Sequence, residues 1–276
     1  MKKTNLNSAW HCECIGRFTA STEVPTCTIN NLIENGYLPK DLLVGKNADA
    51  VKEFENDDWV YTKSFNLSEV SAKSFLRFNR IDTYADVYFN GKILAHVENG
   101  NIEHRFDVSD LVKCGENTLK VCLFSPIKAA DGMPKRNGAF TTERLYTRRT
   151  QCTYGWDWTA RFVSCGIGDV ELITYDEDEP IVRDVYIFTE KIESDAAAVA
   201  VEASLEKEVC RPISFEILSP LKKTVFKEEI CRGGAFYKVC ADIEDAELWY
   251  PVGYGKQPLY TLRLKDGEEI IYEEKF

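Results

Sequence analysis

The sequence contains little histidine, no excess of positive charge and no long apolar run. Only three histidines occur among 276 residues, and they show no spacing typical of a metal site or a nucleophilic dyad. The formal net charge of -11 argues against nucleic-acid binding, which favours basic surfaces. No segment approaches the roughly 20 apolar residues of a membrane-spanning helix. We therefore expect a protein that binds neither nucleic acid nor a membrane.

Two further absences concern targeting and cofactors. The N-terminal segment, residues 1–8, is basic but is followed by no apolar run, so it is not a secretory signal. No glycine-rich loop of the phosphate-binding type occurs. We therefore expect a cytoplasmic protein that needs no cofactor.

Cysteine, in contrast, is abundant, and most cysteines stand singly among apolar, strand-like residues. Without a secretory signal we interpret them as reduced thiols. His11-Cys12-Glu13-Cys14 resembles half of a metal site, but no second ligand pair follows at a usual distance. The favoured interpretation is an alternating first strand with small buried thiols. The ten cysteines are Cys12, Cys14, Cys27, Cys114, Cys122, Cys152, Cys165, Cys210, Cys231 and Cys240.

Helical signals are few and strand signals are many. The segment 26–35 predicts a helix, with Thr28 as its cap and Gly36 after its end. Asn90-Gly91 between two strand-like runs is the strongest short hairpin signal, because both turn positions need a positive φ. The strands expected before the acidic run are 59–65, 82–89, 92–97, 104–108, 117–124 and 168–175.

The acidic run Asp176 to Glu179, ended by Pro180, marks the expected domain boundary. Before it, short strands predict a jelly-roll β-sandwich over residues 1–178. After it, alternation in 197–206 and about seven short strands predict an immunoglobulin-like β-sandwich over residues 179–276. The strands expected there are 181–188, 197–206, 212–218, 224–230, 236–243, 259–264 and 268–276. We expect this all-β chain to be truncated at its last strand or before a following domain.

A long polar loop, residues 125–155, leads into Gly155-Trp156-Asp157-Trp158. Indole faces stack on the apolar face of a sugar ring, and a carboxylate accepts strong hydrogen bonds from sugar hydroxyls. Trp156, Asp157 and Trp158 are therefore candidate carbohydrate-binding residues.

The same motif also has a structural interpretation. Trp158 is as compatible with core packing as with function. A buried Asp157 pairs, on this interpretation, with one of three nearby arginines, which are Arg148, Arg149 and Arg161. A purely structural sandwich protein would bury both Trp156 and Asp157.

A second aromatic cluster, residues 248–260, contains Trp249, Tyr250, Tyr254 and Tyr260. It has the composition of a binding surface. We favour a proline- and glycine-rich crossing between strands, with its aromatic rings packed against a neighbouring domain.

Together these motifs resemble the N-terminal part of glycoside hydrolase family 2, and most closely that of β-mannosidases. The resemblance extends over most of the chain, and Gly155-Trp156-Asp157-Trp158 is its β-mannosidase-like signature. Thr159-Ala160 departs from the small residue and proline usual in the family. The other matching segments are Trp10, 24–25, 38–39, 57–61, 82–91, 107–111, 115–119, 248–251, 253–255 and 257–260.

The resemblance implies a jelly-roll domain, an immunoglobulin-like domain and then a (β/α)8 barrel that carries both catalytic glutamates. This chain would then be the non-catalytic front of a retaining exo-glycosidase that removes terminal β-D-mannose, and its partners would be the C-terminal barrel and a β-linked mannosaccharide or related sugar. The resemblance places Asp157, beside Trp156, at the terminal sugar in the −1 subsite. The alternatives are the front part of a β-glucosaminidase or β-galactosidase of the same family, or a free-standing carbohydrate-binding protein.

Overall fold

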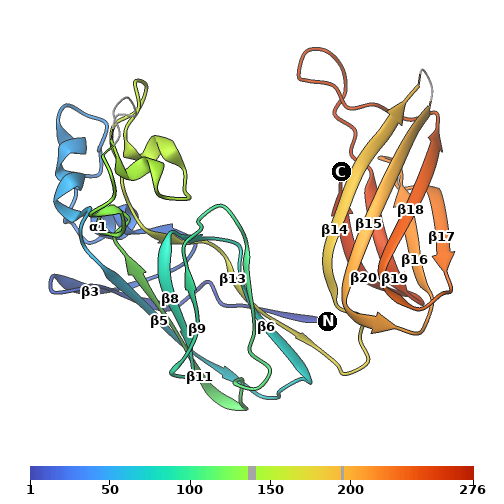
Figure 1. Cartoon of the computed structure of the whole chain (residues 1–276), viewed down its shortest axis with the longest axis horizontal. Coiled ribbons are helices and arrows are strands. Elements are labelled where there is room, and N and C mark those ends of the chain that lie inside the picture. Colours follow the sequence, from blue (N-terminus) through green and yellow to red (C-terminus); the bar gives the residue numbers. More distant parts are fainter. Residues whose placement is uncertain (136–140, 194–195) are drawn as a thin grey trace. The chain divides into compact units, whose positions relative to one another are not determined.

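The computed structural model describes residues 1–135, 141–193 and 196–276, and nearly all of its regular structure is antiparallel β-sheet (Figure 1). The chain divides into two units, Met1–Glu177 and Asp178–Phe276. Each unit has a hydrophobic core of its own. The expected all-β architecture, a jelly-roll sandwich followed by an immunoglobulin-like sandwich, is confirmed.

The first unit is a β-sandwich. Its sheets have the strand orders β1-β13-β6-β10 and β3-β2-β5-β11-β8-β9, and the short strands β4-β12-β7 form a third sheet. The strands are β1 Lys2–Asn5, β2 Trp10–Cys14, β3 Phe18–Thr22, β4 Thr26–Cys27, β5 Trp59–Leu67, β6 Lys73–Phe78, β7 Ile81–Asp82, β8 Tyr84–Phe89, β9 Lys92–Val97, β10 His104–Asp107, β11 Gly115–Phe124, β12 Gly166–Ile167 and β13 Val170–Tyr175.

Alternation explains why these segments are strands, since every second side chain points into the core. In β5, Trp59 and Tyr61 are buried, and their antiparallel partners in β11 are Leu123 and Val121, which are buried too. Asn90 and Gly91 join β8 to β9 with φ of 48° and 81°, as the hairpin signal predicted. The expected strands are therefore confirmed, with ends shifted by a few residues.

Three details of the N-terminal region differ from expectation. The segment that contains Cys12 and Cys14 is a strand with both thiols buried, but it is the second strand, because the polar β1 pairs with β13 ahead of it. Helix α1 spans Thr28–Glu34, and Cys27 rather than Thr28 is its N-cap residue. The Thr28 hydroxyl instead accepts a hydrogen bond from the backbone N–H of Cys165. A 3-10 helix, η1 Asn47–Phe54, lies where no helix was expected.

The described residues of the second unit form a seven-stranded sandwich of the immunoglobulin-like type, with sheet orders β14-β15-β18 and β17-β16-β19-β20. In β15, Val199, Val201, Ala203 and Leu205 all lie in the core, as their alternation predicted. The strands are β14 Val182–Ile192, β15 Ala196–Val209, β16 Ile213–Leu218, β17 Thr224–Ile230, β18 Gly234–Glu244, β19 Thr261–Asp266 and β20 Glu269–Lys275.

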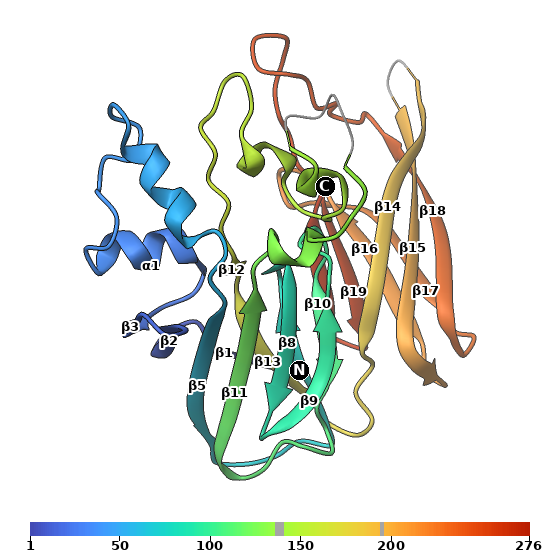
Figure 2. The same ribbon diagram turned by 60° about the vertical axis from the view of Figure 1, so that its left-hand side comes forward.

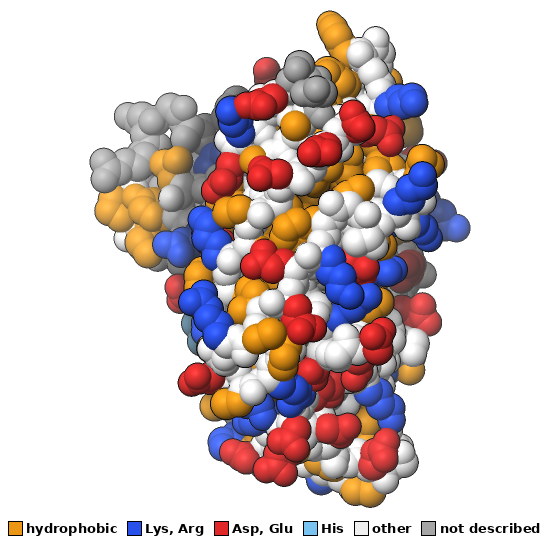
Figure 3. Space-filling model, turned by 90° about the vertical axis from the view of Figure 1, so that its right-hand side faces the viewer, with side chains coloured by type: hydrophobic (Ala, Val, Ile, Leu, Met, Phe, Trp, Pro, Cys, Tyr) orange, Lys and Arg blue, Asp and Glu red, His pale blue; other side chains and the backbone are white. Residues whose placement is uncertain are grey.

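The surface is charged but mixed in sign. The face shown in Figure 3 carries acidic and basic side chains interspersed with hydrophobic ones. Among the described residues, no helix has both the length and the apolar character needed to cross a bilayer.

Candidate functional site

The candidate site lies in the long connection between β11 and β12. Figure 2 shows this connection, in green, at the end of the first unit where α1 and η1 also lie. The described part of the connection contains three short 3-10 helices, η2 Lys128–Ala130, η3 Glu143–Leu145 and η4 Gln151–Tyr154. Part of the expected long loop, residues 136–140 with Gly138, lies outside the described residues.

Trp156 to Thr159 form a tight hairpin with Asp157 and Trp158 at its tip. The Trp156 N–H donates to the Thr159 carbonyl at 3.1 Å, and the Thr159 N–H donates back at 3.4 Å. Gly155 begins the hairpin with φ of 94° and ψ of 143°, a conformation that is essentially restricted to glycine. The backbone therefore presents Asp157 and Trp158 at a defined turn.

The exposure of these side chains tests the structural interpretation of this motif. Trp156 is 43% exposed and Trp158 is 71% exposed, and Asp157 is exposed as well. Core packing of Trp158 is therefore wrong, and so is the burial of Trp156 and Asp157 that a purely structural role required. The structural alternative, a buried Asp157 paired with an arginine, is also wrong, since Asp157 is exposed while Arg149 pairs with Asp82 and Arg161 with Glu55.

Buried side chains beneath the hairpin fix its orientation. The Arg144 guanidinium lies 4.3 Å from the centroid of the Trp156 ring, and Arg144 also donates to the Gln151 carbonyl. A cation over an indole face is attracted by the ring quadrupole. The Tyr154 hydroxyl bonds the Thr147 hydroxyl at 2.7 Å, and burial raises the pKa of Tyr154, so the phenol stays neutral.

Arg161 joins the hairpin to the rest of the unit through an ion pair with Glu55 that the sequence analysis did not predict. Its Nε and Nη2 donate to the two carboxylate oxygens of the buried Glu55 at 2.7 and 2.8 Å, and Nη2 reaches Glu143 at 3.0 Å. Burial alone would lower the pKa of Arg161, but the hydrogen bonds to Glu55 and Glu143 outweigh burial and raise it. The guanidinium therefore stays charged. Since Glu55 and Arg161 are 106 residues apart, no local pattern could reveal the pair.

The first unit also contains a polar pocket of about 520 Å³ that the sequence analysis did not predict. The Gly100 N–H donates to the Arg148 carbonyl, and the Tyr84 hydroxyl donates to the Tyr146 carbonyl, so two hydrogen bonds hold the walls together. The Arg148 side chain is exposed at the rim, whereas the neighbouring Arg149 is buried against Asp82. The pocket is lined by Tyr84, Ala95, His96, Val97, Glu98, Asn99, Ile102, His104, Phe106, Tyr146 and Arg148.

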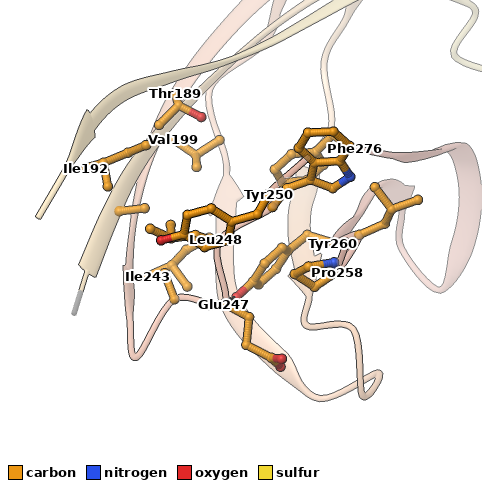
Figure 4. Close-up of a pocket in the computed structure, with 14 residues that line it drawn as sticks. Thr189, Ile192, Val199, Ile243, Glu247, Leu248, Tyr250, Pro258, Tyr260 and Phe276 are labelled. Carbon is orange, nitrogen blue, oxygen red and sulfur yellow. Dashed lines mark hydrogen bonds between the residues drawn. The ribbon is translucent and has the colours of Figure 1, made fainter. Parts of the chain in front are cut away.

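A second pocket, also of about 520 Å³, lies within the second unit and is mainly apolar (Figure 4). It involves the aromatic cluster 248–260, which connects β18 in one sheet to β19 in the other, so the predicted crossing between strands is confirmed. Trp249 is 56% exposed and Tyr254 is 85% exposed. The packing of these rings against a neighbouring domain stays a prediction.

Metal chemistry gains no support from side-chain clusters. Within the described ranges, no group of three or more His, Cys, Asp and Glu side chains is arranged to hold a metal ion. In β2, His11 and Glu13 point to the opposite face from Cys12 and Cys14.

The fold of the first unit is that of the galactose-binding-like sandwiches of glycosidases. Residues 3–169 match the family model described as glycosyl hydrolase 2 galactose-binding domain-like. The match covers more than half of the chain, so the chain belongs to the glycosyl hydrolase 2 family. The resemblance inferred from the motifs is thereby confirmed.

The similar proteins include β-mannosidases. β-Mannosidase B of Thermothelomyces thermophilus is 30% identical over 259 residues, which are 90% of this chain and 30% of that protein. The crystal structure of β-D-mannosidase from Dictyoglomus thermophilum matches 100% of this chain and 36% of its own, with a TM-score of 0.85 and 30% identity. A β-glucuronidase of Bifidobacterium dentium shares the fold at 22% identity and a TM-score of 0.71, over 100% of this chain and 47% of its own. The chain spans about a third of the length of the β-mannosidases that it matches.

Proposed function

We propose that this chain is the non-catalytic front part of a retaining exo-glycosidase that removes terminal β-linked mannose, and that the hairpin 156–159 forms one wall of its −1 subsite. The observation that carries the proposal is an exposed carboxylate, Asp157, flanked in sequence by two exposed indoles on a hairpin that the buried Arg144 and the half-buried Arg161 anchor. The names of the relatives support β-mannoside as the substrate class. The remainder of such an enzyme, a C-terminal barrel, would supply the acid/base and nucleophilic carboxylates.

The hairpin's chemistry suits a sugar hydroxyl pair. Asp157 is an exposed acceptor without an ion pair in the described part of the chain, so its two oxygens are available to two hydroxyl donors. Trp158, which is 71% exposed, and the face of Trp156 opposite Arg144 offer apolar surface for the sugar ring. Hydrogen bonds that strengthen as the ring flattens toward the oxocarbenium-like transition state raise turnover rather than ground-state affinity.

The first prediction concerns Asp157. In the enzyme that includes the barrel, Asp157→Ala should lower kcat/KM for an aryl β-mannoside by roughly 10- to 100-fold, the value of one or two hydrogen bonds to a charged acceptor. Asp131→Ala, an exposed carboxylate of the same connection, is the matched control and should keep wild-type kinetics. The thermal unfolding midpoints of both variants should equal that of the wild type.

Two outcomes would refute this assignment. Wild-type turnover in Asp157→Ala removes this carboxylate from the subsite. Hydrolysis by the purified 276-residue chain alone, at a rate that follows its concentration through purification, refutes the non-catalytic role.

We also propose cytoplasmic residence, which the free state of all ten thiols supports.

The alternative is a free-standing carbohydrate-binding protein, and the polar pocket beside Arg148 favours it, because a second concave site offers affinity that one hairpin does not. Isothermal titration of the 276-residue chain with mannobiose separates the two functions. A dissociation constant below about 1 mM favours the binding protein, since a lone subsite wall yields little affinity. The absence of heat favours the enzyme fragment.

The front part of a β-glucosaminidase or β-galactosidase is the other alternative, and aryl glycosides of those sugars test it.

A further inference from the structure

The second unit carries an apolar groove that the proposed sugar site does not use. Strand residues form one wall of the groove, and the loop after β18 forms the other. Phe276 lies at the edge of the groove. Figure 4 shows these side chains around a common space. The groove residues are Thr189, Ile192, Ala197, Val199, Ile243, Ala246, Glu247, Leu248, Trp249, Tyr250, Pro258, Leu259, Tyr260 and Phe276.

The groove is a built surface and not a loose loop. The Tyr250 N–H donates to the Lys256 carbonyl at 2.9 Å, and the Gln257 amide donates to the Tyr250 carbonyl at 2.7 Å. Gly255 packs so closely on Tyr250 that an added Cβ would lie 2.8 Å from its ring. The loop therefore presents its rings in a fixed arrangement before any partner binds.

Several large apolar side chains of the groove and its loop are exposed and pack only in part within the unit. Ile192 is 58% exposed, Trp249 56% and Leu259 47%, and Val252 and Tyr254 continue the same loop at 86% and 85%. Contiguous exposed apolar surface of this kind marks an interface, because its burial is favourable by roughly 25 cal/mol per Å². Only Glu247 is charged among the lining residues, and the Tyr260 hydroxyl already accepts from the Glu247 N–H. The groove thus suits apolar side chains of a protein and offers few partners to sugar hydroxyls.

The position of Phe276 bears on which polypeptide would bind in the groove. Phe276 exchanges two backbone hydrogen bonds with Tyr260, so the last residue of the chain is fixed in the groove wall. A polypeptide that continues from Phe276 would leave the sandwich at the groove itself. The β-mannosidases that match this chain are about three times as long as the matched part.

We propose that the aromatic groove is the docking surface for the polypeptide that follows Phe276 in a longer form of this protein, with apolar side chains of that polypeptide seated between Tyr250, Leu259 and Phe276. The inference rests on the proposed function, in which that polypeptide is the catalytic barrel. The groove then fixes the front part to the barrel, whereas the hairpin 156–159 contacts substrate.

Hydroxyl-radical footprinting of the 276-residue chain and of the complete product of its gene tests the proposal. Trp249 and Tyr250, which line the groove and are 56% and 45% exposed, should be oxidised several-fold more slowly in the complete product. Trp59, which is buried, and Tyr186, which is 58% exposed on β14 outside the groove, are internal controls whose rates should not change.

A pair of variants gives an independent readout. Trp249→Ser should lower the thermal midpoint of the complete product and leave that of the 276-residue chain unchanged, because the ring is exposed in the chain alone. Phe236→Ser, which removes a ring 59% exposed on β18 outside the groove, should change neither midpoint. A Trp249→Ser effect of equal size in both proteins would contradict docking.

The outcomes separate this inference from the proposed function. If Trp249 reacts as fast in a longer product as in the chain alone, the groove is not a docking surface, and the proposed function is unaffected. A reading frame that ends after Phe276 overturns both. A concentration-dependent dimer of the 276-residue chain that protects Trp249 would assign the groove to a second copy and overturn the proposed occupant.

Discussion

Arg161 connects the hairpin to the rest of the first unit through charged hydrogen bonds to Glu55 and Glu143. It lies two residues after the hairpin and neutralises Glu55, whose side chain is only 5% exposed. Removal of one partner from a buried ion pair leaves an uncompensated charge, which costs more than the pair itself contributes. Glu143 shares the same guanidinium but is more exposed, so its removal leaves the buried pair intact.

Arg161→Met should therefore lower the free energy of unfolding by about 2–4 kcal/mol in urea denaturation followed by tryptophan fluorescence. Glu143→Gln should lower it by about 1 kcal/mol or less. In the double variant Glu55→Gln/Arg161→Met the loss should be smaller than in Arg161→Met, since no buried charge remains. A double variant less stable than Arg161→Met would show that Arg161 acts by packing and not by charge.

At the scale of elements, the sequence predicts those parts whose signals are local. Alternation identified β5 and β15, and Asn90-Gly91 identified the hairpin that joins β8 to β9, because each depends on neighbouring residues. Strand β1 escaped prediction because its four residues, Lys2–Asn5, are polar, and pairing with β13 supplies its stability. η1 escaped because Val51 is its only buried residue.

In the candidate site, too, the sequence predicts local features and not contacts between distant segments. The residue types of Trp156, Asp157 and Trp158 indicated sugar chemistry, but their exposure and their place on a hairpin required the fold. The Glu55 pair of Arg161 and the Asp82 pair of Arg149 join segments 106 and 67 residues apart, so sequence spacing carries no information about them.

The hairpin as an element depends on Gly155. Its φ of 94° lies in a region that other residues adopt at a cost of about 1–3 kcal/mol, and an added Cβ would stand 3.5 Å from that of Arg161. Gly155→Ala should lower the free energy of unfolding by that amount in urea denaturation. Gly234→Ala, at a position outside the positive-φ region where the nearest atom is 3.7 Å away, is the control and should change it by about 1 kcal/mol or less. Equal stability of the two variants would mean that the turn tolerates a side chain.

The whole molecule holds ten free thiols in three environments. Four are exposed, Cys114, Cys210, Cys231 and Cys240, and three are buried, Cys12, Cys14 and Cys165. Burial raises the pKa of Cys14 and that of Cys165 to about 12. Since the thiolate is the reactive species, these buried groups are protected both by their low access and by their protonation at neutral pH.

Titration of the native chain with an aromatic disulfide reagent at pH 8 should therefore show a fast phase that corresponds to the four exposed thiols. The half-buried Cys27, Cys122 and Cys152 should react more slowly, and Cys12, Cys14 and Cys165 only as the first unit unfolds. In denaturant without reductant, all ten should react. A total below ten in protein purified without reductant would reveal disulfides, which form in oxidising compartments and persist there, and would contradict the proposed cytoplasmic residence. Fast reaction of Cys165 in the native state would instead show that the core of the first unit opens readily around this thiol, because burial is what raises its pKa.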